Sequence, residues 1–203
     1  MATRAGRLLP LVLVAATVWG SCAAAAAAST GDPKQYVLQV GDLPTGFAEV
    51  ASFYRAAEDA AYQSPISVTR YRAWGFSRGY EAVYAPAHPR PTPAHVGRPE
   101  IFSVADLYDS VIGAERSLSA HAATCGKPPF SRLGLSGFDV GEAEALCRVS
   151  AGAEEAYVLY WRRGPVVASV VIVGTAGGAP PGHQLGLAEK LARVEDGRIA
   201  SAG

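Results

Sequence analysis

The sequence lacks an excess of charge of either sign. Its 203 residues include 18 Lys and Arg against 18 Asp and Glu, so the formal net charge is zero. Without Arg4 and Arg7, which lie in the first segment of the chain, 16 basic residues remain against 18 acidic ones, a formal net charge of −2. Proteins that bind nucleic acid or anionic membranes through charge need a concentrated positive surface. We therefore expect no nucleic-acid partner and no electrostatic membrane attachment.

Motifs for catalysis and metal binding are also missing. The segment Gly134–Phe138 lacks the final glycine of a nucleophile elbow, and Gly174–Gly178 lacks the Lys-Ser/Thr ending of a phosphate-binding loop. Acidic pairs such as Glu195-Asp196 are interpreted as solvated charge. No His-Glu-x-x-His arrangement occurs among the four histidines, which are His88, His95, His121 and His183. We expect no catalytic residue, no cofactor and no metal, and an enzyme is the least favoured class.

The N-terminal segment has the features of an export signal. Arg4 and Arg7 precede an apolar run from Leu8 to Val18, which is shorter than the roughly 20 residues that span a bilayer. We expect a signal peptide at 1–21, a small-residue tether at 22–31 and one folded domain at 32–203. Two outcomes of cleavage stay open. A signal peptidase cuts among Ala23–Ser29 and releases a secreted protein, or Cys22, preceded by two small residues, becomes a lipid attachment site on the outer face of the cytoplasmic membrane.

Cysteine is scarce, and its count is odd. Of the three cysteines, Cys22 is either lipidated or removed, which leaves Cys125 and Cys147. Outside the cytoplasm such a pair is expected to form a disulfide. The alternative is a metal site, because His121 lies four residues before Cys125 on a predicted helix, but this set has only three ligands and no recognisable fourth.

The pattern of apolar residues predicts an α+β domain. Strands are expected at 47–52, 79–85, 100–103, 142–149, 155–161 and 166–173, and helices at 32–40, 55–62, 104–123 and 184–199. The expected architecture is an antiparallel sheet of about five strands that ends in a three-strand meander and is packed by two main helices, 104–123 and 184–199. The segment Val166–Val173 is apolar at nearly every position, which predicts a strand buried on both faces, between helices or around a pocket.

Aromatic residues gather in one stretch of the chain and are the candidate ligand site. With interspersed arginines they suit an amphiphilic ligand, although ordinary packing in a sheet is the alternative interpretation. The five residues are Tyr71, Trp74, Phe76, Tyr80 and Tyr84. The proline-rich segment at 85–99, with His88 and His95, is expected to be an exposed connector or a docking segment in polyproline conformation.

Three stretches carry a resemblance to known proteins. Asp42–Phe47 resembles a "DLPxGF" opening, Trp161–Gly174 resembles an "RxGxxVaxVxxxG" hairpin, and Leu187–Ile199 resembles a closing "LAxxxxxRI" helix. Together they resemble exported proteins and lipoproteins of high-GC bacteria, among them PsbP/Mog1-like envelope lipoproteins and extracellular kinase sensor domains. The resemblance implies an α/β sandwich and an envelope binding or sensing function, and it carries no catalytic residue.

The functional expectation is a non-catalytic exported or lipid-anchored module that binds a small apolar or amphiphilic ligand. A protein–protein interaction module of the cell envelope, using the proline-rich segment and exposed strand edges, is the alternative. The chain is expected to be a monomer.

Overall fold

The fold is known from a computed structural model, which describes residues 31–62, 64–87, 100–134, 139–151, 154–175 and 183–202. Two short 3-10 turns, η1 and η2, precede the strands and helices. The elements are η1 (Pro33–Gln35), η2 (Val40–Asp42), β1 (Phe47–Arg55), α1 (Ala57–Tyr62), α2 (Val68–Ala73), β2 (Phe76–Pro86), β3 (Glu100–Tyr108), α3 (Val111–Thr124), β4 (Phe130–Leu133), β5 (Ala143–Ala151), β6 (Glu154–Arg163), β7 (Val166–Thr175) and α4 (His183–Ala202).

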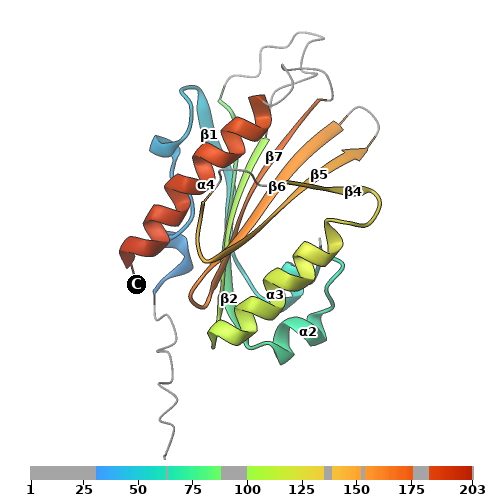
Figure 1. Ribbon diagram of the computed structural model, residues 1–203. Coiled ribbons are helices and arrows are strands. Elements are labelled where there is room, and N and C mark those ends of the chain that lie inside the picture. The colour runs from blue at the N-terminus through green and yellow to red at the C-terminus, as the bar shows by residue number, and fades with distance from the viewer. Residues whose placement is uncertain are drawn as a thin grey trace, which may run out of the picture.

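The strands form one antiparallel sheet in the order β1-β2-β3-β7-β6-β5-β4 (Figure 1). Within the described residues the sheet has seven strands, and the expected α+β class is confirmed. The expected C-terminal meander is β5-β6-β7, in which each strand pairs with the next along the chain. The short strand β4, which the sequence analysis did not predict, adds an edge strand next to β5.

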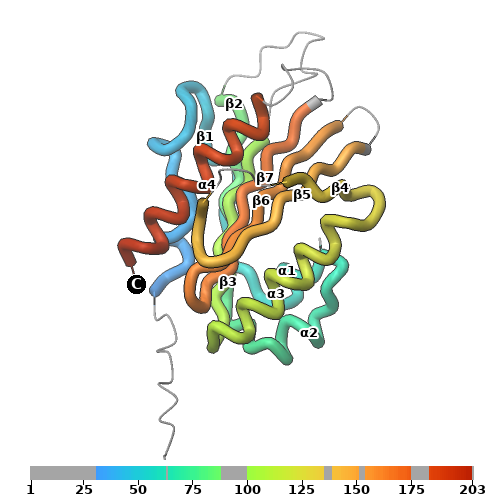
Figure 2. Tube along the Cα trace, viewed as in Figure 1, coloured from blue at the N-terminus to red at the C-terminus, as the bar shows by residue number. Residues whose placement is uncertain are grey.

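Helices cover both faces of this sheet. The long helix α4 packs on one face against β6 and β7, while α1, α2 and α3 lie on the opposite face (Figures 1 and 2). Strand β7 has apolar side chains on both of its faces because each face packs against a helix. Its even-numbered residues, such as Val170 and Ile172, belong to the core under α4, whereas Val167 belongs to the core under α3. The near-continuous apolar run at 166–173 therefore belongs to a strand covered on both sides, as expected.

The predicted helix at 104–123 is wrong in its first part. Residues up to Tyr108 belong to β3, which pairs with β2 on one side and β7 on the other. Helix α3 begins only at Val111, where the side chain of Ser110 accepts a hydrogen bond from the backbone N–H of Gly113, a typical N-cap. A central strand with apolar residues on both faces mimics helical spacing over a few positions, so the pattern alone did not separate the two.

The three stretches that carry the sequence resemblance contact one another on the α4 side. Arg198 of α4 donates to both carboxylate oxygens of Asp42, with Nη2–Oδ2 and Nη2–Oδ1 distances of 2.7 and 2.9 Å. Arg163, at the end of β6, donates to both carboxylate oxygens of Asp196 at 2.8 and 2.6 Å. These bidentate ion pairs fix the opening turn and the hairpin against the closing helix. Asp196 is therefore not solvated charge, as the sequence analysis expected, but a buried partner of Arg163.

In the described part of the chain, no helix combines the length and the hydropathy needed to cross a membrane. The expected signal peptide at 1–21, Cys22, nearly all of the tether and most of the proline-rich segment lie outside the described residues.

Candidate ligand-binding site

Strand register places a cluster of charges on the α3 face of the sheet. Arg55 on β1 pairs with Gly79 on β2, and Gly79 pairs in turn with Asp106 on β3. Glu81, two residues after Gly79, points to the same face because side chains alternate along a strand. Since Gly79 has no side chain, Arg55 reaches across β2, and its Nη1 lies 3.4 Å from Oδ1 of Asp106. Its Nε lies 3.5 Å from Oε2 of Glu81.

This cluster lines a cavity of about 210 Å³ between the sheet and helices α1 to α3. We call it the charged cavity. Its floor is the apolar surface of β3 and β7, with Val104, Val171 and Val173 among the lining residues. Such a combination of apolar walls and a few converging polar groups is typical of small-molecule sites, although the volume lies below the roughly 300–1,000 Å³ common for them.

Burial sets the protonation of the acids in this cavity. It raises the pKa of Asp106 from 3.8 to about 6, a shift that the Arg55 guanidinium opposes and the Glu81 carboxylate reinforces. Burial likewise raises the pKa of Glu81, again against the effect of Arg55. Burial disfavours the charged form of Arg55 as well, but the two carboxylates outweigh it and raise the pKa of the guanidinium. Burial therefore disfavours the charge on all three groups, and the opposite charges of the neighbours favour it.

Aromatic side chains line the charged cavity where it adjoins a second one. The ring of His121 on α3 stacks on Tyr160 of β6 with their centroids 4.4 Å apart. The hydroxyl of Tyr71 donates to Oγ of Ser64 at 3.2 Å and lies 3.3 Å from Nε2 of His121. Burial, and after it the positive charge of Arg55, lowers the pKa of His121 to about 4, so its ring is neutral at physiological pH.

The second cavity, of about 190 Å³, lies toward β5 and is called the disulfide cavity. It shares Ser64, His121, Tyr160 and Val171 with the charged cavity, so the two adjoin. Its remaining lining is mainly apolar and includes Phe130, Val158 and Cys147.

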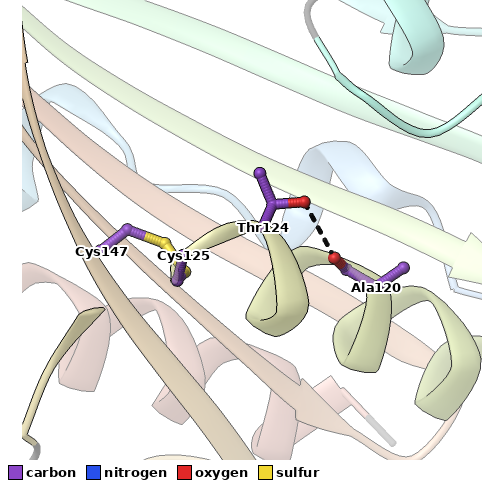
Figure 3. The surroundings of a disulfide bond; sticks show 4 residues. All are labelled: Ala120, Thr124, Cys125 and Cys147. Atoms are coloured by element: carbon purple, nitrogen blue, oxygen red, sulfur yellow. Dashed lines mark hydrogen bonds between the residues drawn. A yellow bond between two sulfur atoms is a disulfide. The ribbon is translucent and has the colours of Figure 1, made fainter. Parts of the chain in front are cut away.

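A disulfide joins Cys147 of β5 to Cys125, the residue that ends α3 (Figure 3). The two Cα atoms are 5.0 Å apart, within the usual range for such a bond. In the preceding turn, Oγ1 of Thr124 donates to the carbonyl oxygen of Ala120 at 3.0 Å. The bond thus attaches the C-terminal end of α3 to the sheet at the border of the disulfide cavity.

The alternative metal site of His121, Cys125 and Cys147 is wrong, because both sulfur atoms belong to the disulfide. No group of three or more His, Cys, Asp or Glu residues that could hold a metal ion occurs within the residues that the structure describes.

The five aromatic residues of the candidate ligand site do not come together. Tyr80 and Tyr84 belong to the core under α4, whereas Tyr71, Trp74 and Phe76 pack on the opposite side of the sheet. Of the five, only Tyr71 lines the charged cavity. The others are packing residues: the ring of Phe76, for example, meets Tyr71 and Tyr108 edge to face at centroid distances of 5.6 Å.

The charges of the cavity were missed by the sequence analysis. Asp106 was placed in the predicted helix 104–123, and Arg55 at the start of the predicted helix 55–62. One signal was present: Asp106 and Glu81 are acids inside strongly apolar strands, and a buried acid in a strand needs a partner. The register that brings Arg55 to them, by contrast, depends on pairing between segments far apart in the sequence.

Comparison with known proteins gives a likeness in fold only. No family model matches the chain, and a search of curated proteins finds no match in sequence. Among solved structures, the chain is similar to the crystal structure of the extracellular domain of PknH from Mycobacterium tuberculosis, with a TM-score of 0.50 and 9% sequence identity. The match covers 82% of this chain and 97% of that one. The described domain thus has the fold of that extracellular domain.

Proposed function

We propose that the protein is a non-catalytic binding or sensing module of the cell envelope, and that its ligand is a small amphiphilic molecule held in the charged and disulfide cavities. The observation that carries this proposal is the pair of adjoining cavities between the sheet and α1–α3, with buried charges at one end and apolar side chains at the other.

The polar groups in these cavities favour binding over chemistry. Among the described residues, the hydrogen bonds of Ser64 Oγ are those it accepts from the Tyr71 hydroxyl and from the backbone N–H of Ile66, and neither partner is a base that would activate a nucleophile. The neutral ring of His121 is stacked on Tyr160 and packed as part of a wall. These are the features of a shaped, partly polar pocket.

Three features support a location outside the cytoplasm: the signal-like N-terminal segment, the disulfide, and the likeness in fold to an extracellular domain. The proposed location is extracellular or at the outer face of the cytoplasmic membrane, with Cys22 as the attachment residue in the anchored form.

A protein partner is the second candidate function, and it has its own supporting observation. The edge strand β1 exposes Val50 and Phe53, with 60% and 44% of their surfaces accessible. An edge strand with exposed apolar side chains is a surface on which another chain can pair.

The ligand proposal is tested by native mass spectrometry of the protein purified without detergent. We expect an added mass that is lost on denaturation. Val171→Phe, which places a larger side chain in the wall shared by both cavities, should abolish the added mass, whereas Ile112→Phe on the exposed side of α3 should keep it. A bare chain mass, or an added mass that Val171→Phe leaves unchanged in a folded protein, would overturn the proposal in favour of a protein partner.

A further inference from the structure

We propose that the ligand of these cavities is a small amphiphilic cation, an ammonium group on an apolar body. The ammonium lies against Asp106 in the charged cavity, and the apolar body extends past His121 toward the disulfide cavity. This inference rests on the proposed function and names the chemical class of its ligand.

The first argument is the charge of the cavity. Asp106 and Glu81 are two acids that share the single guanidinium of Arg55. Among the described residues that line the charged cavity, the other base is His121, whose neutral ring supplies no charge. When both acids are ionised, one negative charge is left without a counterion in a buried site, where an unpaired charge is costly.

The second argument is an acceptor without a donor. Asp106 is 6% exposed, and its Oδ1 receives no hydrogen bond from the described residues although Arg55 lies beside it. Buried carboxylate oxygens are normally hydrogen-bonded. An ammonium group has three N–H donors and one positive charge, so it satisfies both the missing hydrogen bond and the missing charge.

The third argument is the shape of the space next to this acceptor. The lining changes from charged at Asp106 to apolar at Val171, and beyond His121 to Phe130 and Val158. A purely hydrophilic cation would leave this apolar surface without contacts. An anion would be repelled by the carboxylates of Asp106 and Glu81, and the guanidinium of Arg55 is already paired with both of them. A neutral molecule would leave the excess negative charge without a counterion.

The groups that face Asp106 come from several elements. Arg55 of β1 lowers the pKa of Asp106, and Glu81 of β2 raises it. Burial raises the pKa values of Tyr71 on α2 and Tyr108 at the end of β3, and the charge of Asp106 raises them further. Both tyrosines stay neutral at physiological pH, since their pKa values are raised from 10. Burial also raises the pKa of Tyr160 on β6, so this side chain stays neutral as well. Among the described residues that line the cavity, the protonation of Asp106 and Glu81 is therefore what changes its charge between mildly acidic and neutral pH.

The test compares three probes of one chain length, hexylammonium, 1-hexanol and hexanoate, by titration calorimetry with the purified protein at pH 8. NMR shifts then locate each probe. We expect hexylammonium to bind about tenfold more tightly than 1-hexanol, as a hydrogen bond to a charged group implies, and hexanoate to bind most weakly. Asp106→Asn should remove the advantage of hexylammonium over 1-hexanol, and the control Asp109→Asn, which removes an exposed acid at the end of β3, should retain it.

A second measurement does not depend on any variant. Lowering the pH from 8 to 5 protonates Asp106, so the affinity for hexylammonium should fall while that for 1-hexanol stays constant. If 1-hexanol or hexanoate binds in the cavities as tightly as hexylammonium, the cationic class is wrong and the proposed pocket stands. If none of the three shifts signals of the cavity residues, the proposed function fails together with this inference.

Discussion

Gly79 and Asp106 pair across β2 and β3, and Oδ1 of Asp106 occupies the space into which a Cβ at position 79 would project. The carbonyl oxygen of Ala105 would also lie only 3.2 Å from that Cβ. The absence of a side chain at Gly79 thus makes room both for the carboxylate and for the guanidinium of Arg55 that crosses β2 to reach it.

Gly79→Ala should disrupt the charged cavity. The new methyl group overlaps the Asp106 carboxylate and must displace it from Arg55, and overpacking of this kind costs about 1–3 kcal/mol of stability. We expect a lower free energy of unfolding in urea and weaker binding of hexylammonium than in the unchanged protein.

Gly197→Ala is the matched control for this substitution. Gly197 is exposed within α4, and a Cβ there meets no atom within 4 Å. Because alanine favours a helix by about 1 kcal/mol over glycine, this variant should gain stability and bind the probe normally. Equal effects of the two substitutions would contradict the role assigned to Gly79.

Asp106→Asn should change how stability depends on pH. The pKa of Asp106 is about 6 in the folded protein against 3.8 for an ordinary aspartate, so the folded state binds the proton more tightly. The stability that this group contributes is full below about pH 4 and is lost as the pH rises through 6. Two pKa units correspond to about 3 kcal/mol.

Urea unfolding at a series of pH values checks this prediction. Between about pH 4 and pH 7, the unfolding free energy of the Asn variant should rise by about 3 kcal/mol relative to that of the unchanged protein. Taking the difference between the two proteins removes the contributions of acids that do not interact with Asp106. Parallel curves would mean that Asp106 titrates as an ordinary aspartate.

The sequence predicted those elements whose pattern is local. Strands β5, β6 and β7 and helix α4 were found because alternation, turns and helical spacing are read within one segment. The segment before α3 was misassigned because β3 is apolar on both faces, with Ile101 and Leu107 toward α4 and Tyr108 toward α3. A strand covered on both sides loses the alternation that distinguishes it from a helix.

The aromatic residues show a second limit. Phe76, Tyr80 and Tyr84 are an even number of residues apart and would share one face of a regular strand. A register shift between Phe76 and Arg78 breaks the alternation, and Phe76 packs on the side opposite to Tyr80. One extra residue in a strand reverses the face of everything beyond it, and no composition rule locates such a bulge.

Glu195 is a second buried acid, on the α4 side of the sheet, and it was also predicted to be solvated. Its Oε2 accepts a hydrogen bond from Oγ of Ser103 at 2.5 Å, and that hydroxyl accepts one from the backbone N–H of Leu38. Burial raises the pKa of Glu195 well above its ordinary value, against the opposing effect of the Ser103 hydrogen bond. Its contribution to stability is therefore present at low pH and lost as the pH rises through the raised value.

Glu195→Gln keeps the acceptor for Ser103 and carries no charge. We expect the variant to be at least as stable as the unchanged protein at pH 8, with this advantage shrinking as the pH falls, measured by urea unfolding at pH 5 and 8. Ser103→Ala, which removes a donor and an acceptor together, should lose about 1–2 kcal/mol at both pH values. A difference in stability between the Gln variant and the unchanged protein that is the same at pH 5 and pH 8 would show that Glu195 is held as a carboxylate.

The disulfide should stabilise the protein mainly by restricting its unfolded chain. Cys125 and Cys147 are separated by 22 residues, and closing a loop of that length contributes about 3 kcal/mol. The double variant Cys125→Ala/Cys147→Ala should lose about this amount of unfolding free energy. Both cysteines are buried, so alanine fits the space without adding a polar group.

Reduction of the unchanged protein distinguishes the effect of the cross-link on stability from the effect of replacing the cysteine side chains. Protein treated with a thiol reductant should unfold at a lower denaturant concentration than the oxidised form. Its midpoint should lie near that of the double alanine variant, because both lack the cross-link. Coincident unfolding curves for the oxidised and reduced protein would mean that the cross-link adds nothing. The attachment of α3 to β5 would then depend on the packing of Cys125 and Cys147 against Ala145 and Val158, the other buried residues of that small core cluster.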